Sequence, residues 1–255
     1  MLHNTELGKS SSYSRSYSPS LLVQVKREQQ NINGYDIWRC FEVSWINEND
    51  TPEIATIVIC YPANSPYIVE SKSLKLYLGS FNFKKFKSKA SVTTTIAIDL
   101  SAVTASNVSV SFEYNLQRTQ KIKGTCIDSY NDEKQKHDKK IITTKSQHHD
   151  ETVYSDVFRS RCPVTSQPDW ATIIIKYSGN KIEYSSLIRY LLSFRNCNEF
   201  HEQCVSKIYT DIWQQCQPTK LEVQGCFMRR GGIDINPFRT SEKGVLPNNI
   251  YLPRQ

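Results

Sequence analysis

The amino-acid sequence predicts an α+β protein built from two similar modules, and three observations lead to this prediction. Apolar runs of strand length, either alternating or continuous, occur in both halves of the chain. A polar stretch separates the two halves near the middle of the chain. A segment of the first half returns in the second half at a constant shift in numbering. A length of 255 residues permits one large domain or two fused modules.

The strands are predicted from the spacing of apolar side chains. Between Ile37 and Trp45 every second residue lies on one face of an extended segment, as expected for a strand with one buried face. Other segments are continuous apolar runs, which are typical of strands buried on both faces. The predicted strands cover residues 34–47, 53–61, 107–116, 171–179 and 220–230.

A repeated segment predicts one helix in each half. ESKSLKLYLGSFN begins at Glu70 and EYSSLIRYLLSFR begins at Glu183, and the two share seven identical residues in thirteen at a shift of 113. Average residue usage gives about one match by chance. In both copies Leu, Tyr, Leu and Phe recur at the spacing of one apolar helix face. A further helix is predicted over 199–216, and we expect an internal duplication.

The two modules are expected to cover residues 1–126 and 152–255. Residues 127–151 between them are almost wholly polar and show no strand or helix period until Ile141 and Ile142. We interpret this stretch as a solvated polar linker.

The net charge indicates which partners the chain favours, and its hydropathy argues against a membrane protein. The chain has 32 Lys and Arg against 25 Asp and Glu, a net charge of +7, which favours anionic partners such as nucleic acid or a phosphorylated cofactor. No apolar run approaches the ~18 residues of a membrane-spanning helix, and the first 20 residues lack the apolar core of a secretory signal. We therefore expect a cytoplasmic protein with no membrane contact.

Among the eight cysteines, Cys162 has the most unusual surroundings. No C-x-x-C pair occurs and no Cys stands at zinc-ligand spacing from a His, so no metal site is predicted. Cys162 begins the sequence CPVTSQPD, a loop stiffened by two prolines that ends at Asp169. Arg159 and Arg161 nearby would favour its thiolate. Cys162 is a candidate nucleophile, and the alternative is one more buried core thiol.

His201 and Glu202 are candidates for recognition of a flat ligand. With Phe200 they place an aromatic face, an imidazole and a carboxylate at the start of one helix. This set suits a heterocycle with N–H donors, since a carboxylate accepts two hydrogen bonds. The alternative is a solvated Glu on a helix surface.

The candidates for phosphate binding are Lys72, Lys75, Arg229 and Arg230. The two arginines lead into Gly231-Gly232, where the backbone can approach a ligand closely. No G-x-G-x-x-G follows a strand and no Walker A sequence occurs, so a nucleotide would be bound in another way. The run KKFKSK at 84–89 suits either RNA or an ordinary solvated face.

Six motifs together resemble the NADPH-dependent 7-cyano-7-deazaguanine reductases of queuosine biosynthesis, in their long bimodular form. The ESKSLK stretch is similar to the signature that separates this family from related pterin enzymes. The resemblance covers nearly the whole chain, except for the polar stretch 127–151 and several cysteines. The motifs, in that family's order, are LGKSSSY at 7–13, GYDIW at 34–38, VESKSLKLYLGSFN at 69–82, CPVTSQPDW at 162–170, FHE at 200–202 and RRGGIDINP at 229–237.

The resemblance implies a tunnelling fold (T-fold) of two tandem modules, each an antiparallel sheet with helices on one face, assembled as a homodimer. It implies reduction of 7-cyano-7-deazaguanine to 7-aminomethyl-7-deazaguanine by two hydride transfers from NADPH. By similarity, Cys162 adds to the nitrile carbon to form a covalent thioimide and Asp169 donates a proton. A thioimide carbon accepts hydride more readily than a nitrile does.

The resemblance also implies which residues bind the two ligands. The implied substrate contacts are Val69, Glu70, Ser71, His201 and Glu202. The implied NADPH contacts are Ser71, Lys72, Arg230 and Gly231. These positions draw on both halves of the sequence, and no metal ligand is among them.

Two other functions remain open from the residues alone. A T-fold hydrolase or cyclase acting on a pterin or purine would need a metal or another group that activates water, and zinc-ligand spacing is absent. A basic RNA-binding module agrees with the net charge, but the basic residues are spread along the chain without an aromatic RNA-binding signature. We expect no direct contact with nucleic acid.

Overall fold

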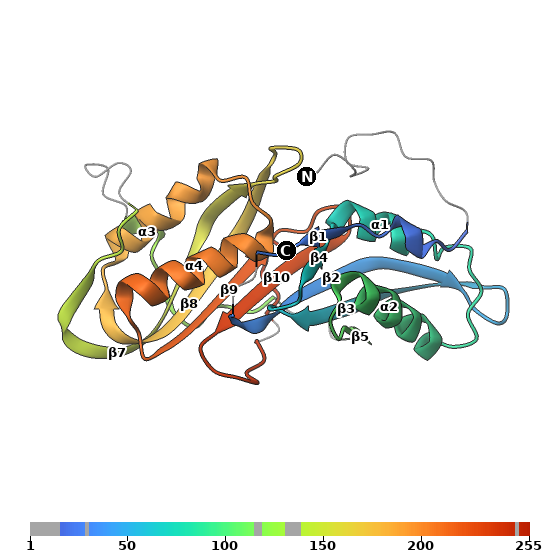
Figure 1. The fold of residues 1–255 in the computed structure, drawn as a ribbon, viewed down its shortest axis with the longest axis horizontal. Helices are drawn as coiled ribbons and strands as arrows, with labels where there is room; N and C mark the ends of the chain where they lie inside the picture. Colours follow the sequence, from blue (N-terminus) through green and yellow to red (C-terminus); the bar gives the residue numbers. More distant parts are fainter. Residues whose placement is uncertain (1–15, 29–30, 115–118, 131–138, 248–249) are drawn as a thin grey trace. The chain divides into compact units, whose positions relative to one another are not determined.

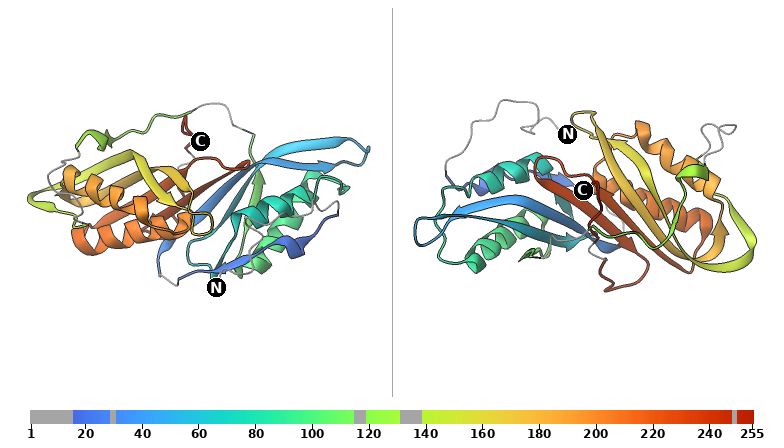
Figure 2. Two further views of the ribbon diagram at one scale, coloured as in Figure 1. Left: turned by 90° about the horizontal axis from the view of Figure 1, so that it is seen from above. Right: turned by 180° about the vertical axis from the view of Figure 1, so that it is seen from behind.

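The computed structural model of the chain describes residues 16–28, 31–114, 119–130, 139–247 and 250–255 (Figures 1 and 2). The LGKSSSY motif at 7–13 lies outside the described residues. The chain divides into two compact units. Unit 1 is drawn from Met1–Gln29, Asp36–Arg118 and Arg229–Asp234, and unit 2 from Gln30–Tyr35, Thr119–Met228 and Ile235–Gln255.

Unit 1 is a small sheet with two helices on one face (Figure 2). Its strands have the order β5-β3-β2, and β3 pairs antiparallel with β5, with Ile57 opposite Phe112. Strands β1 and β4 form a separate antiparallel pair. In chain order the elements are η1 (Pro19–Leu21), β1 (Gln24–Lys26), β2 (Asn33–Ile46, in this unit from Asp36 onward), β3 (Pro52–Pro62), β4 (Tyr67–Val69), α1 (Ser71–Gly79), α2 (Lys89–Thr104) and β5 (Ser109–Phe112).

The predicted strands 34–47 and 53–61 are confirmed, and β2 also carries a buried charge. The predicted strand 107–116 is the shorter β5, and residues 115 and 116 lie outside the described ranges. Val43 and Trp45 are fully buried, as the alternation predicts, and so is Arg39 on the same face. A buried guanidinium requires a partner because desolvation of a charge is costly. Arg39 Nε donates to Asp234 Oδ1 at 2.8 Å, so an ion pair compensates the charge.

Unit 2 is a larger sheet whose strands have the order β10-β9-β8-β7-β6. Helices α3 and α4 cover one face of this sheet (Figures 1 and 2), and the main core lies between them and the strands. The β7–β8 and β8–β9 pairs are antiparallel, while the short β6 is parallel to β7. The elements are β6 (Thr125–Cys126), η2 (Asp128–Tyr130), β7 (Thr143–Arg161), β8 (Pro168–Ile182), α3 (Tyr184–Leu192), η3 (Ser193–Asn196), α4 (His201–Cys216), β9 (Lys220–Phe227) and β10 (Ile233–Thr240).

The predicted linker 127–151 and the module boundaries differ from the structure. Residues from Thr143 onward are not a linker but the first part of β7, which pairs with β8 from Thr143 opposite Ile182 to Arg161 opposite Pro168. The first part of β7 is polar and has no alternating apolar residues from which a strand could be predicted. It is stabilised by backbone pairing with the long apolar β8. Residues 119–126, expected in the first module, belong to unit 2, and Arg229–Asp234, expected in the second, belong to unit 1.

The helices of the two units repeat each other in length and spacing. Helices α1 and α3 each have nine residues, and α2 and α4 each have sixteen. In both units a Tyr of the first helix donates to an Asp of the second, Tyr77 to Asp99 at 2.6 Å and Tyr190 to Asp211 at 2.7 Å. The same contact at equivalent positions supports the internal duplication.

Helix α2 was not predicted from the sequence. Its middle is rich in β-branched residues, including three consecutive threonines, which lower helix propensity. Buried Val92 and Ile96 alternate with exposed Ala90, Thr94 and Ile98, so apolar residues are spread around the helix. Two signals at its ends define it, namely a capping box at Ser88 and a left-handed residue, Ala105, at its C-terminus.

The predicted α+β class, with helices on one face of the sheet in each of two modules, is confirmed. None of the helices in the described ranges is long and apolar enough to span a membrane.

Candidate functional site

Cys162 lies in the hairpin loop between β7 and β8, at the first position after β7. Its N–H donates to the Gln167 carbonyl at 2.8 Å, and its carbonyl accepts from the Ser166 N–H at 2.9 Å. Ser166 has a φ of +56°, a left-handed conformation that turns the chain back toward β8. The loop is therefore closed by backbone hydrogen bonds. Cys162 is partly exposed, so a reactant can reach its thiol.

Asp169 and His201 form a pair beside this loop, and the His201 side chain is partly exposed. Asp169 lies near the start of β8, opposite Ser160 of β7, and is 4% exposed. Its Oδ2 lies 3.3 Å from Nε2 of His201, the first residue of α4. The imidazole stacks on Phe227, with ring centroids 3.9 Å apart and planes 13° apart. The stack and the carboxylate together fix the ring orientation.

The structure brings Cys162, Asp169 and His201 to the same end of the β7–β8 hairpin. Ser160 faces Asp169 across the pair of strands, and Cys162 follows two residues later. The segment that leads into α4 runs beside the same loop, because Glu199 N–H donates to the Arg161 carbonyl at 3.2 Å. A thiol, a buried carboxyl group and an imidazole at one place are the groups needed for nucleophilic addition coupled to proton transfer.

Glu202 is held in place by Arg239, a residue that the sequence analysis did not identify. Glu202 is 2% exposed, and its backbone carbonyl accepts from Arg239 Nη2 at 3.1 Å. Arg239 is fully buried on β10 and also donates from Nε to Ser206 Oγ at 2.8 Å. Its remaining hydrogen bonds include the Tyr35 carbonyl at 3.2 Å. The sequence signal for this residue is an Arg beside Phe238 near the end of the strand IDINPFRT, in which Asp234 is the other charged residue.

The VESKSLK motif of unit 1 begins α1. Glu70 is the N-cap, and its carboxylate accepts from the Lys72 N–H at 2.8 Å and the Ser73 N–H at 2.7 Å. Val69 and Glu70 are buried, whereas Ser71 is exposed and Lys72 is partly exposed. The Glu70 carboxylate therefore organises the start of the helix, while Ser71 and Lys72 face accessible space.

Arg230 and Gly231 lie in a tight turn of unit 1 that contacts α1. Gly231 and Gly232 have φ values of +59° and +79°, which glycine adopts without strain. A Cβ on Gly231 would lie 3.0 Å from Lys75 Nζ, so the turn lies against the side chain of that helix residue. Arg229 stacks on Phe41, with its guanidinium carbon 3.5 Å from the ring centroid.

These residues fit the phosphate groups of NADPH. The turn and the first turns of α1 gather Lys72, Lys75, Arg229 and Arg230 in one unit, although the sequence placed them in different modules. Lys75 Nζ lies 3.7 Å from a carboxylate oxygen of Glu42, and both side chains are about half exposed or more. An exposed ion pair of this kind contributes little, so the lysine can exchange Glu42 for a phosphate.

The predicted site residues thus form two groups, each within its own unit. Cys162, Asp169, His201 and Glu202 belong to unit 2. Val69, Glu70, Ser71, Lys72, Arg230 and Gly231 belong to unit 1.

Burial raises the pKa of several thiols other than Cys162. Burial raises the pKa of Cys40 and of Cys204 well above the ordinary range. It raises the pKa of Cys216 to about 12, and that of Cys60 to about 11 with a further contribution from the charge of Asp36. Thiols with such pKa values are protonated near neutral pH and are poor nucleophiles.

The KKFKSK run is largely paired within unit 1. Lys85 Nζ lies 2.7 Å from Asp50 Oδ1, and Lys89 Nζ lies 3.7 Å from Glu53 Oε2. Lys84 Nζ lies 3.4 Å from the ring centroid of Tyr17. These contacts favour the solvated-face interpretation of the run over an RNA grip.

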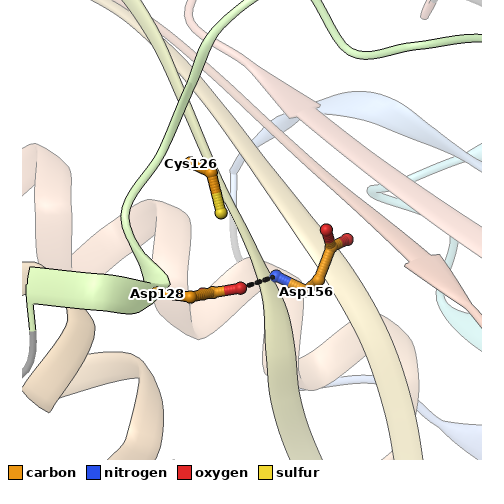
Figure 3. A group of neighbouring side chains, drawn as sticks. All are labelled: Cys126, Asp128 and Asp156. Atoms are coloured by element: carbon orange, nitrogen blue, oxygen red, sulfur yellow. Dashed lines mark hydrogen bonds between the residues drawn. The ribbon is translucent and has the colours of Figure 1, made fainter.

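Cys126, Asp128 and Asp156 form a cluster outside the predicted site (Figure 3). One potential metal-ligand atom from each lies within 4.8 Å of the others. The Asp128 carboxylate accepts from Ser155 Oγ at 2.6 Å and from the Asp156 N–H at 3.0 Å. Asp156 accepts from Thr172 Oγ1 at 2.5 Å. These hydrogen bonds give the carboxylates a structural role in joining η2 to β7 and β8.

Comparison with known proteins gives matches along the whole chain. A family model described as nitrile reductase, 7-cyano-7-deazaguanine-reductase N-term, matches residues 13–112, and one described as QueF-like protein matches residues 168–245. An NADPH-dependent 7-cyano-7-deazaguanine reductase of Acinetobacter baylyi is 42% identical over 264 residues, covering 98% of this chain and 97% of the relative. One of Paraburkholderia xenovorans is 40% identical over 267 residues, with the same coverage. A solved structure of an apo archaeosine synthase QueF-Like aligns with 41% of the chain at a TM-score of 0.34 and 13% identity.

Proposed function

The chain belongs to the family of NADPH-dependent 7-cyano-7-deazaguanine reductases, and from this premise we propose that it reduces the nitrile of 7-cyano-7-deazaguanine to the primary amine. The single observation that supports the chemistry best is the Asp169–His201 pair, with 3.3 Å between Oδ2 and Nε2, beside the partly exposed Cys162. The product, 7-aminomethyl-7-deazaguanine, belongs to the route to queuosine in tRNA.

The first step is addition of Cys162 to the substrate. The Cys162 sulfur forms a bond to the nitrile carbon, and the nitrile nitrogen takes up a proton from Asp169, so that the triple bond becomes the C=N bond of a thioimide. His201 orients the Asp169 carboxyl group through the contact described above. The loop hydrogen bonds of Cys162 keep the sulfur at this end of the hairpin during the addition.

Reduction completes the reaction. When bound, NADPH supplies two hydrides, one from each of two cofactor molecules, which together with two protons convert the nitrile to the amine. The bond between the Cys162 sulfur and the carbon breaks after the first reduction, and the sulfur leaves as a thiolate. The cysteine is then ready for another cycle.

Substrate recognition is assigned to His201 and Glu202, with Val69, Glu70 and Ser71 as further contacts by resemblance of the motif. The substrate's guanine-like edge carries N–H donors that suit a carboxylate acceptor. The buried Arg239 supports this role because it fixes the backbone of Glu202.

Cofactor binding is assigned to Ser71, Lys72, Arg230 and Gly231. The approach of Lys75 to Gly231, in the turn that follows Arg229 and Arg230, supports the assignment, since guanidinium and ammonium groups bind phosphate strongly. We further propose a cytoplasmic homodimer that contacts neither membrane nor nucleic acid directly.

The test is oxidation of NADPH, followed by absorbance, with and without 7-cyano-7-deazaguanine. The proposal predicts oxidation only in the presence of the nitrile, with two NADPH consumed for each amine formed. Oxidation that does not depend on the nitrile, or release of ammonia or a hydrolysed ring in place of the amine, would identify a different reaction, including the pterin or purine hydrolase alternative.

A further inference from the structure

Three arginines of unit 2 surround the indole of Trp170, on the opposite face of the sheet from His201. Trp170 follows Asp169 on β8, so their side chains point to opposite faces. The guanidinium carbons of Arg195, Arg159 and Arg254 lie 5.6, 5.9 and 6.0 Å from the ring centroid. We name these four side chains the Trp170 cluster.

Trp170 lies on the face of the sheet away from α3 and α4, whereas Arg195 reaches its ring from η3, directly after α3. Ile173 and Ile175 belong to the core under α3 and α4, whereas Ile174, between them, packs with Leu252 of the C-terminal segment. By the same alternation along β8, Trp170 shares the face of Ile174 and Leu252. Arg159 is directly opposite Trp170 in the β7–β8 pairing and shares that face. The cluster is therefore distinct from the Asp169–His201 pair.

The three positive charges have no acidic partner among the described residues. Arg159, Arg195 and Arg254 form no ion pair there. The buried arginines of unit 1 behave differently, because Arg39 pairs with Asp234 and Arg27 pairs with Asp36.

The hydrogen bonds of the cluster use only part of its donor capacity. Arg159 Nη2 donates to the Arg195 carbonyl at 3.0 Å, Arg195 Nη2 to the Val157 carbonyl at 3.3 Å, and Arg254 Nη1 to the Asp156 carbonyl at 2.6 Å. The Nε atoms of Arg159 and Arg195 are buried without a hydrogen-bond partner in the described part of the chain. Each guanidinium carries five N–H donors.

From these observations we propose that the Trp170 cluster binds the phosphate of a phosphate ester. The three guanidinium groups lie around one ring and form no ion pair among the described residues, so a bound anion would lower their mutual repulsion. A phosphate dianion has enough charge and acceptor oxygens to serve more than one guanidinium fork. The indole adds an aromatic surface for the base or ring that such an ester carries. The proposal goes beyond the reductase function and does not depend on it.

Binding of inorganic pyrophosphate by the full-length chain, measured by titration calorimetry at low salt, tests the proposal. Arg254→Gln and Arg195→Gln should each weaken binding ~10-fold, the loss expected for one charge-assisted contact. Arg254 is exposed in the C-terminal segment, so its variant is expected to fold, and thermal unfolding checks this. Lys181→Gln removes an exposed charge elsewhere in unit 2 and is the matched control.

Two further variants locate the binding. Trp170→Phe should abolish the change in tryptophan fluorescence on pyrophosphate binding, which distinguishes Trp170 from the other three tryptophans. Arg230→Gln removes a charge from the assigned cofactor site. Loss of binding in Arg230→Gln with normal binding in Arg254→Gln would overturn the proposal, as would Arg254→Gln binding as tightly as Lys181→Gln, or no binding by the unmodified chain.

Binding of two ligands, NADPH and a short single-stranded RNA, shows which kind of phosphate ester the cluster binds. If the cluster serves the cofactor, Arg254→Gln weakens binding of NADPH and leaves binding of a short single-stranded RNA unchanged. If it serves an RNA backbone, the opposite is expected, and the proposed absence of direct nucleic-acid contact is then wrong. Because these are binding measurements, they stand apart from nitrile-dependent NADPH oxidation, and failure of one proposal is distinguishable from failure of the other.

Discussion

His201 Nε2 lies 3.3 Å from Asp169 Oδ2, so the first residue of α4 is joined to the start of β8. Asp169 is buried, His201 is partly exposed, and the stack of the imidazole on Phe227 orients the ring. Each group is held by an element of regular structure, and Cys162 follows the strand that pairs with β8. The proposed proton donor and the proposed nucleophile are therefore held by the same hairpin.

Asp169→Asn is expected to slow turnover far more than it weakens substrate binding. The amide keeps the shape and hydrogen-bonding capacity of the carboxyl group but cannot transfer a proton near neutral pH. General acid catalysis contributes ~10²–10⁴-fold, so kcat should fall by that factor while KM for the nitrile changes little. A variant that keeps its rate at saturation but loses affinity would show that Asp169 is a binding residue.

Arg230→Ala and Lys72→Ala are each expected to raise KM for NADPH. Both residues lie in unit 1, at the two elements that meet where Lys75 contacts the Gly231 turn. If they bind one ligand, the double variant should deviate from additivity. Lys207→Ala, at an exposed ion pair on α4, is the control for loss of charge.

Adduct formation at Cys162 should remain intact in these cofactor variants, because capture of the nitrile precedes hydride transfer. It is best followed across pH, since the lost charge can also affect the thiolate. Strictly additive effects, or normal NADPH kinetics in either single variant, would contradict a shared cofactor site.

Alkylation by iodoacetamide near neutral pH should modify Cys162 much faster than Cys60 or Cys216. The pKa of Cys60 is raised to about 11 and that of Cys216 to about 12, so both remain protonated until the pH approaches those values. Peptide mapping over time gives the relative rates. Rapid labelling of Cys216 in the folded chain would mean that α4 does not bury it as described.

Arg239→Lys is expected to raise KM for the nitrile more than it lowers kcat. Lysine keeps the positive charge but cannot donate to the Glu202 carbonyl, Ser206 Oγ and the Tyr35 carbonyl at once, as the guanidinium does. Arg239 is a positioning residue in this account, because it acts through Glu202. Equal losses in kcat and in kcat/KM, with KM unchanged, would contradict a role in substrate positioning.

Much of the fold could be predicted from the sequence because the spacing of apolar residues within a single helix or strand is local information. Helices α1 and α3 follow from Leu, Tyr and Leu at helical spacing, although the Phe predicted on the same helix face lies just beyond each helix, at Phe81 and Phe194. Strands β2 and β3 follow from alternating or continuous apolar residues. Strand β7 could not be predicted in this way, because its first half is polar and its pairing with β8 is a long-range property of the backbone.

In the site, too, short motifs could be predicted from the sequence, whereas contacts between residues far apart in the chain could not. The Cys162 loop and the His201-Glu202 pair are visible as short motifs, and Asp169 lies close in sequence to Cys162. The contact between Arg239 and Glu202 joins residues far apart in the chain, and so does the packing of the Gly231 turn against Lys75. Only the folded chain reveals that Arg230 lies in the same unit as Lys72.

The most direct measurement of the central claim is intact-protein mass spectrometry of the chain with 7-cyano-7-deazaguanine and no NADPH. A mass increase of one whole substrate molecule per chain is expected, mapped to Cys162, lost on addition of NADPH and absent in Cys162→Ala. An adduct on another cysteine, or full turnover by Cys162→Ala, would contradict it.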